Sequence, residues 1–405
     1  MAGLTPGSPA TGGTLAWRRK LRQGNPMARS TVSVGRILGI PIQLDYSWFL
    51  IFGLLTWMLA SNYYPKEFPH WSPAMYWVTA AATALLLFAS VLLHELGHSF
   101  VALRSNIPVR SITLFIFGGV AQIGAEPITP KAEFLIAIAG PAVSLSLALL
   151  LTIVQPALVT IEPLLGLAKY LAYINFALAV FNLIPGFPLD GGRVFRSIIW
   201  AATKDMRRAT LIAANSGRFF GYLFIFSGVW RALSGDLGGL WIAFIGWFLE
   251  NAASAQVHQV TFQGLLAGHR VSQAMSTQCP SVAPELTLQQ LVDEHVLGGG
   301  RRCFLVGHGE ETLGLMTLHR IKEVPRSEWD TTTAAQVMLP IASLKSISAG
   351  TDLWAALQML DRDGVNQLPV MAGNQVIGML SRDDVITFLG TMQELGSTTP
   401  QLNPR

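Results

Sequence analysis

Long apolar runs separated by short polar segments dominate the first 260 residues of this 405-residue chain. A helix needs about 20 mostly apolar residues to cross a bilayer. Six runs approach or exceed that length, although the first and last are short or end in polar residues. They occupy residues 46–63, 75–102, 132–155, 164–185, 209–232 and 237–256. The pattern predicts a polytopic α-helical membrane domain of about six spans over residues 45–257.

One stretch of this domain has a different pattern. Residues 111–124, SITLFIFGGVAQIG, alternate along the chain and are rich in β-branched and aromatic side chains. Gly118 and Gly119 lie in the middle, which is typical of a strand or hairpin. Such backbone survives at membrane depth only if it is buried in protein or lines a wet cavity. We therefore expect a small membrane-embedded β-hairpin or sheet.

Beyond residue 260 the chain becomes polar and contains an internal repeat. VSQAM at residues 271–275 aligns with AAQVM at residues 334–338, a shift of 63 residues, and the following segments align in turn. Each unit is predicted to run helix, short strand, strand, helix. We expect a soluble α/β domain made of a linker and first repeat (258–325), a second repeat (326–390) and a flexible tail (391–405).

Composition and charge support a membrane protein and suggest its orientation. Only 13% of residues are charged and 51% are hydrophobic, whereas about a quarter are charged in soluble domains. Residues 1–44 contain basic but no acidic side chains, and the loops 103–131 and 190–208 are also basic. Basic loops stay in the cytoplasm. The N-terminus, these loops and the C-terminal repeats are therefore predicted to be cytoplasmic, most simply at a bacterial plasma membrane.

The basic segment 1–44 allows more than one interpretation. It has no interleaved aromatic pattern and precedes a membrane span, which favours a topology anchor and no nucleic-acid partner. An organelle transit peptide has a similar composition and stays open.

The sequence HELGH at His94–His98 ends an uncharged run that begins at Met75. In a helix, His94 and His98 lie one turn apart on one face, about 6 Å along the axis. That spacing allows two imidazoles to bind one zinc ion, with Glu95 beside them to accept a proton from water. Ionisable groups are costly at the end of an apolar span, which indicates a function.

A second polar element follows the fourth predicted span. In NLIPGFPLDGGR (residues 182–193), Pro185 and Pro188 are expected to unwind the helix, and Gly191 and Gly192 permit close backbone approach. Asp190 would then be free to move toward another helix, although PLDGG alone is also compatible with a simple turn. The second and fourth spans end on the same predicted side. Two histidines and a carboxylate would leave a tetrahedral zinc one open position.

These motifs resemble the site-2 protease family of intramembrane zinc metalloproteases over most of residues 36–256. The matching segments are Gly39–Phe49, His94–His98, Phe117–Gly124, Ala139–Pro141 and Asn182–Gly192. The resemblance implies one Zn²⁺ per chain, held by His94, His98 and Asp190, with Glu95 as general base. It also implies that Asn182 lies near the reaction centre, and that the strand with Gly118 and Gly119 is an edge onto which the substrate pairs.

The same resemblance implies the type of substrate. Members of the family cleave single-span membrane proteins within the membrane, often anti-sigma factors or membrane-tethered transcription regulators, after a first protease has removed the outer part. The expected activity is therefore that of a zinc metalloendopeptidase in regulated intramembrane proteolysis.

The C-terminal repeats resemble a tandem pair of CBS domains, which commonly bind adenine nucleotides. GMLSRDD places Ser381 and Asp384 where the family has a hydroxyl and a ribose-binding Asp, whereas the first repeat has Arg320 at the Asp position. Nucleotide binding at one site and a ligand-free homodimerisation module are both compatible with this pattern.

Two other classes of protein share parts of the pattern. A CBS-regulated membrane transporter or channel also combines a membrane block with such repeats, and its intramembrane ionisable groups would serve conduction. A catalytically inactive scaffold is the other class. A glutamate flanked by two histidines, together with Asp190, suits hydrolysis and has no purpose in a pore, so we favour the protease.

Overall fold

The computed structural model describes residues 31–116, 118–124, 127–277, 280–298, 303–308, 311–373 and 375–395. The chain divides into two compact units at Val260 and Thr261. Most of the predicted basic segment, residues 1–30, lies outside the described residues, and so do residues 396–405 of the predicted tail.

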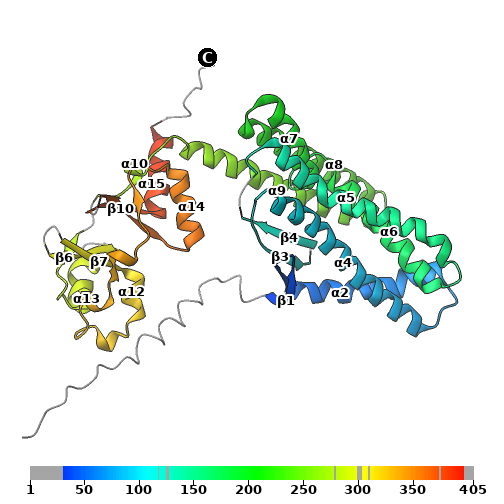
Figure 1. Ribbon diagram of the computed structural model, residues 1–405, viewed down its shortest axis with the longest axis horizontal. Helices are drawn as coiled ribbons and strands as arrows, with labels where there is room; N and C mark the ends of the chain where they lie inside the picture. The colour runs from blue at the N-terminus through cyan, green and yellow to red at the C-terminus, as the bar shows by residue number, and fades with distance from the viewer. Residues whose placement is uncertain are drawn as a thin grey trace, which may run out of the picture. The chain divides into compact units, whose positions relative to one another are not determined.

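The first unit is mainly helical (Figure 1). Ser72 and Thr129 accept hydrogen bonds from backbone N–H groups in the first turns of α4 and α5, and a proline follows each cap. Such caps fix where a helix begins. The helices are α2 (Tyr46–Met58), η2 (Leu59–Tyr63), α3 (Tyr64–Glu67), α4 (Pro73–Arg104), α5 (Pro130–Val154), η3 (Gln155–Leu158), α6 (Glu162–Asn182), α7 (Asp190–Thr203), α8 (Met206–Leu233) and α9 (Gly238–Leu266).

Four of these helical segments are long and apolar enough to cross a membrane. They are Pro73–Arg104, Pro130–Leu158, Glu162–Asn182 and Met206–Leu233. They confirm the predicted spans two to five. The first and last predicted spans do form helices, α2–α3 and α9, but neither meets the same criterion within the described residues. The predicted total of about six spans is therefore not confirmed by length and composition.

Helix α7 corrects the expectation for residues 190–208. We expected a loop that leaves Asp190 free to move, whereas Asp190 is the first residue of a 14-residue helix. Apolar residues at helical spacing, including Val194 and Ile198, outweigh the loop character of the two glycines before them. The unwound segment is limited to residues 183–189. The Asp190 carboxylate is therefore carried by the end of a packed helix.

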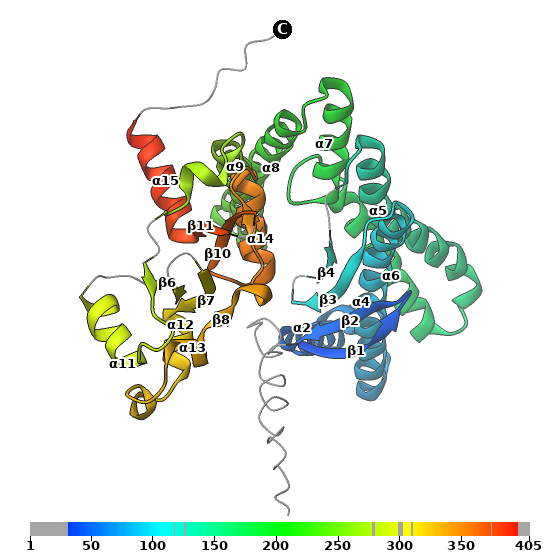
Figure 2. The same cartoon turned by 60° about the vertical axis from the view of Figure 1, so that its left-hand side comes forward.

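A four-stranded sheet lies beside α4 (Figure 2). It contains β1 (Thr31–Ile37), β2 (Ile40–Asp45), β3 (Val109–Phe115) and β4 (Gly118–Ile123), in the order β1-β2-β3-β4. β2 and β3 are parallel, and the two outer pairs are antiparallel.

The predicted hairpin is β3–β4, but the sheet that contains it begins at Thr31, inside the segment expected to be only an N-terminal anchor. Ile42 and Ile112 of the sheet pack with Leu96 of α4. Because Leu96 lies between the two histidines, the sheet is fixed against the HELGH turn.

The second unit contains two small α/β lobes. One sheet has the order β5-β6-β7-β8 and the other β11-β10-β9. The elements of the first repeat are α10 (Val271–Ala274), β5 (Ser281–Val282), α11 (Leu288–Gln290), η4 (Leu291–Leu297), β6 (Cys303–His308), β7 (Glu311–Thr317), α12 (Leu318–Glu323) and η5 (Arg326–Glu328). Those of the second are α13 (Ala334–Val337), β8 (Leu339–Pro340), η6 (Ile341–Ser343), β9 (Ile347–Ser348), α14 (Leu353–Asp363), β10 (Gln367–Ala372), β11 (Gln375–Ser381) and α15 (Arg382–Glu394).

The two repeats exchange their first elements, which the sequence did not predict. Val271 of α10 lies in the core of the second lobe, and Ala334 of α13 lies in the core of the first. Likewise β8 pairs with β7, and Ser276 pairs with Met379. A division between repeats at residue 325 therefore does not separate the lobes. Helix α15 also continues to Glu394, into the segment expected to be a flexible tail.

Candidate metal centre

His94 and His98 lie on the buried face of α4. Their residues are 4% and 5% exposed, and their Nε2 atoms are 3.2 Å apart. One helical turn separates the two residues, as the spacing in the sequence predicted.

Helix α5 orients both imidazole rings. The Nδ1 of His98 donates to the carbonyl oxygen of Ile136 at 2.7 Å, and the Nδ1 of His94 lies 2.9 Å from the hydroxyl of Ser144. A carbonyl oxygen can only accept, so the Nδ1 of His98 carries the proton and its Nε2 lone pair is free in the neutral ring. A histidine needs this tautomer to bind a metal through Nε2.

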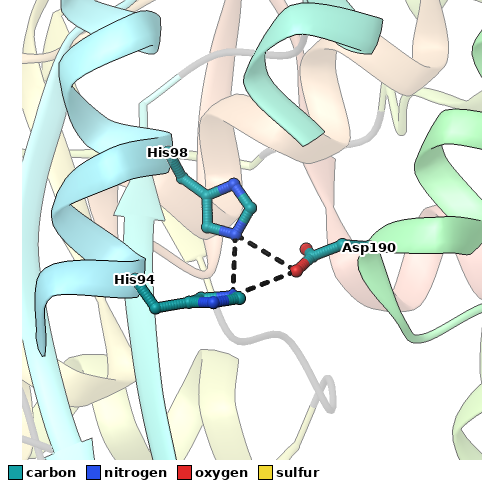
Figure 3. Close-up of side chains that lie close together, drawn as sticks. All are labelled: His94, His98 and Asp190. Carbon is teal, nitrogen blue, oxygen red and sulfur yellow. Dashed lines mark hydrogen bonds and ion pairs between the residues drawn. The ribbon is translucent and has the colours of Figure 1, made fainter. Parts of the chain in front are cut away.

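Asp190 completes a triangle with the two imidazoles (Figure 3). Its Oδ2 lies 3.1 Å from the Nε2 of His94 and 3.2 Å from the Nε2 of His98. The Gly191 and Gly192 backbones pack directly on residues 183–187, too close for any side chain. The predicted close approach at these glycines is confirmed, and it fixes the start of α7.

The triangle fits a zinc ion. Zinc bonds to nitrogen and oxygen are about 2.0–2.2 Å long, so neighbouring ligand atoms in a tetrahedral site are about 3.3 Å apart. The three edges here are 3.1–3.2 Å. A cation bound between the three atoms would satisfy the lone pairs that converge inside this buried site. The donor set of two nitrogens and one carboxylate oxygen suits zinc.

The space for an ion depends on two glycines at the crossing of α4 and α5. A Cβ on Gly140 would lie 2.6 Å from the Nε2 of His94 and even closer to that of His98. A Cβ on Gly97 would lie 3.0 Å from the carbonyl oxygen of Ala139. Neither position accepts a side chain without displacing the helices or the imidazoles.

Glu95 points from α4 toward the sheet. Its Oε2 accepts a hydrogen bond of 3.2 Å from the Ala121 backbone N–H of β4. A Cβ on Gly119 would lie 2.6 Å from the Cγ of Glu95, so the strand backbone touches this side chain. The structure thus brings Glu95 and the Gly119 strand together beside the two histidines.

Two other predicted site residues lie on α6 and β4, and both of these elements contact α4. Asn182 is the last residue of α6 and is half-buried. Gly118 begins β4 with a φ of +126°, a conformation that requires glycine.

Ser381 and Asp384 lie in the second unit, where they cap α15. The Asp384 Oδ2 accepts from the Ser381 backbone N–H at 2.8 Å and from its hydroxyl at 2.6 Å.

Several residues around the centre were not predicted from the sequence. Ser144 and the Ile136 carbonyl orient the histidines, and Gly140 makes room beside them. Gly140 belongs to the segment Ala139–Pro141, which was noted only as a match to the family. Glu133 forms a buried ion pair with Arg196, and it is the one acidic residue between positions 127 and 161. A single acidic residue in an apolar run is the feature of the sequence that could have identified Glu133.

Comparison with known proteins identifies the family. The family model described as "Peptidase family M50" matches residues 82–164 and 153–225, and the CBS domain model matches residues 334–391. A protein of Synechocystis sp. named as a zinc metalloprotease is 37% identical over 375 residues, covering 92% of this chain and 98% of its own. A similarly named protein of Mycobacterium tuberculosis is 36% identical over 373 residues, covering 89% and 93%.

A solved structure matches part of this chain. The site-2 protease from Methanocaldococcus jannaschii is 30% identical and covers 56% of this chain and 95% of its own, with a TM-score of 0.39.

The family model and the named relatives identify a membrane metallopeptidase, and its apolar helices bring two histidines and an aspartate together. The chain belongs to peptidase family M50, the site-2 proteases, and carries CBS repeats after its membrane unit. Members of this family act on membrane-anchored substrates. The alternative of a CBS-regulated transporter or channel is not supported.

The approach of α5 to the histidines leads to a prediction. Replacing Gly140 with Ala places a methyl group where the two Nε2 atoms converge, so zinc affinity should fall by at least about tenfold. Competition with a chromophoric chelator measures the affinity in detergent. Gly53→Ala is the control, because a Cβ there meets nothing within 4 Å. Unchanged zinc affinity in Gly140→Ala would show that the ion does not occupy this space.

Proposed function

We propose that this protein hydrolyses peptide bonds within the transmembrane segments of single-span membrane proteins, such as anti-sigma factors or membrane-tethered transcription regulators. One zinc ion per chain is held by His94, His98 and Asp190, and Glu95 is the general base. The observation that carries the proposal is the triangle of ligand atoms with edges of 3.1–3.2 Å beside a glutamate.

The residues of the chain have separate roles in the proposed reaction. When bound, zinc supplies Lewis-acid polarisation of the scissile carbonyl and of the attacking water. The Oε2 of Glu95 is held by the Ala121 N–H, so Oε1 is the oxygen that accepts the proton of the water. Asn182 ends α6 just before the loop that leads to Asp190, and we propose that it contacts the substrate near the reaction centre.

Strand β4 is the proposed docking edge for the substrate. It pairs with β3 on one side, and no strand pairs with its other side among the described residues. Backbone N–H groups alternate in direction along a strand, so those of Gly119 and Ile123 point to the same side as the Ala121 N–H, away from β3. An unwound substrate that pairs along this edge, including Gly118 and Gly119, would lie against the general base.

Substitution of the base separates catalysis from metal binding. Glu95→Gln should retain zinc and reduce cleavage about 10²- to 10⁴-fold, because only proton transfer is removed. Asp190→Ala should instead lower zinc content. Metal analysis and cleavage of a reporter membrane substrate measure both effects. Glu67→Gln is the matched control, since Glu67 is exposed and pairs with Lys169. Normal cleavage by Glu95→Gln would exclude the proposed mechanism.

We further propose that α2–α3 is a membrane span in addition to the four apolar helices. The segment is helical without a break from Tyr46 to Glu67. Trp48 packs on Phe88 with ring centroids 5.1 Å apart, and the Tyr64 hydroxyl lies 2.6 Å from that of Thr83. The segment therefore runs antiparallel to α4 at the same depth. Its outer face is apolar, with exposed Phe49, Leu50, Leu54 and Trp57.

Helix α9 is supported as the sixth span by its packing on α8. Gly228 meets the backbone of Ala243, and Gly221 meets the backbones of Gly246 and Glu250. Small residues allow such contact between membrane helices. Glu250, which makes α9 less apolar, pairs with Arg218 of α8 at 3.6 Å. Because α8 and α9 are in contact over several turns, we propose that α9 crosses the membrane beside α8.

We propose that the N-terminus and the CBS repeats are cytoplasmic, a proposal supported by an even number of spans and by the basic loops. In a cysteine-free background (Cys279→Ser, Cys303→Ala), an impermeant maleimide should label Lys66→Cys and Ser234→Cys from outside intact cells. Ser327→Cys should be labelled only after lysis, because it lies in the cytoplasmic repeats. All three positions are exposed. Labelling of Ser327→Cys in intact cells, or protection of Ser234→Cys, would contradict this topology.

We also propose that the second CBS repeat binds an adenine nucleotide. The Asp384 Oδ2 is held by Ser381, which leaves Oδ1 to accept hydrogen bonds from ribose hydroxyls. In the first repeat, the corresponding Arg320 pairs with Glu323 at 2.7 Å and offers no carboxylate. One nucleotide per chain is therefore expected.

Calorimetry on the purified protein with ATP, ADP and AMP tests this site. We expect binding at or below millimolar concentration, and Asp384→Asn should weaken it at least about tenfold, since a charge-assisted hydrogen bond is lost. Asp383→Asn is the neighbouring control. If no nucleotide binds, sedimentation should show whether the repeats form a homodimer instead.

A further inference from the structure

A buried ion pair connects α5 to the helix that carries Asp190. Glu133 is 0% exposed and Arg196 is 6% exposed. The Nε and Nη2 of Arg196 both donate to the Oε1 of Glu133, with an Nε–Oε1 distance of 2.6 Å. The other carboxylate oxygen, Oε2, is buried and has no hydrogen-bond partner among the described residues. Such a pair loses much of its hydration energy, so stability alone does not explain it.

The pair lies where it controls the geometry of the metal centre. Asp190 is the first residue of α7, and Arg196 is six residues further, about 9 Å along the same helix. Glu133 precedes Ile136 by one turn of α5, and the Ile136 carbonyl orients His98. A single turn of α5 therefore holds a histidine ligand through its carbonyl and holds the aspartate helix through an ion pair.

Arg196 also contacts the loop before Asp190. Its guanidinium carbon lies 5.1 Å from the ring centroid of Phe187, within the range of a cation–π contact. The Phe187 N–H donates to the Ala213 carbonyl of α8 at 3.2 Å. The guanidinium thus links α5, α7 and the loop 183–189, so both sides of Asp190 are fixed by one side chain.

We propose that Glu133 and Arg196 are positioning residues that set Asp190 at ligand distance from the two histidines. This inference rests on the proposed metal-binding role of His94, His98 and Asp190. Loss of the pair should let α7 shift relative to α5, which lengthens the distances from Asp190 to the imidazoles. Metal affinity and coordination should then change while the helices remain folded.

The test uses the full-length protein in detergent. The main variant is Glu133→Leu/Arg196→Met, because apolar residues of similar volume often preserve stability at a buried ion pair. Arg196→Lys keeps the charge but lacks the planar guanidinium that makes two hydrogen bonds. Arg231→Met/Asp236→Asn is the control, since it removes an exposed arginine–carboxylate pair at the α8–α9 turn.

Two measurements separate positioning from a merely structural role. Chelator competition gives the zinc affinity, which we expect to fall about 10- to 100-fold in both Arg196 variants. Cobalt(II) absorption reports coordination geometry, and its bands should differ from those of the parent protein. The thermal unfolding midpoint of the metal-free protein should stay close to that of the control, and excess zinc should restore cleavage.

The possible results distinguish the positioning role of the ion pair from the metal site itself. Unchanged zinc affinity and an unchanged cobalt spectrum in a folded Arg196 variant would overturn the inference. If both Arg196 variants unfold, the pair is structural and the inference is wrong as well. Asp190→Ala serves as the reference: if it binds zinc as tightly as the parent, the proposed metal site itself fails, which is a different result.

Discussion

The close approach of α4 and α5 at Gly97 and Gly140 is the constraint on which the first unit depends. Because neither glycine has a side chain, the two helices approach closely enough for α5 to hydrogen-bond the imidazoles of α4. The same approach leaves the Nε2 atoms facing a space that Asp190 closes from α7. Moving α5 outward by the size of one methyl group would lose both the orientation of the rings and the convergence of the three ligand atoms.

Each polar side chain of the centre has a defined hydrogen-bond partner. Each histidine uses Nδ1 for a partner on α5, which leaves Nε2 for the centre. Glu95 is on the same helix but faces β4, so its carboxylate is separated from the ligand set and tied to the strand. Glu95 and the two histidines therefore lie on different faces of α4, Glu95 toward the sheet and the histidines toward α5.

The sequence predicted the parts of the site that depend on local pattern. HELGH predicted a helix with two histidines on one face, and PLDGG identified Asp190 as the third member. Alternation and a glycine pair predicted the hairpin β3–β4. These signals are carried by residue type and spacing within one segment. The HELGH helix and the hairpin are present at the expected positions, whereas Asp190 begins a helix where an unwound segment was expected.

The parts that were missed depend on contacts between distant segments. A backbone carbonyl such as that of Ile136 has no signature in a sequence. The partners Glu133 and Arg196 belong to helices separated by a whole span, so only the packing of α5 on α7 reveals the pair. Residues 190–208 were expected to be a loop because they are basic, lie between two apolar runs and follow the two prolines, and tertiary packing instead stabilises a helix there. The sheet partners of β3 were missed because a parallel pairing joins strands far apart in the chain.

The exchange of short elements between the CBS repeats sets the order in which this region is able to fold. Val271 enters a core whose other members include Leu368 and Leu380, and Ser276 pairs with Met379, about a hundred residues later. The first lobe is complete only after β8 (Leu339–Pro340), and the second only after β11 (Gln375–Ser381) and α15 have left the ribosome. Contacts of such long range slow folding. During synthesis, the N-terminal membrane unit emerges first. The apolar surface of α10 then stays partly unburied until β11 has been made.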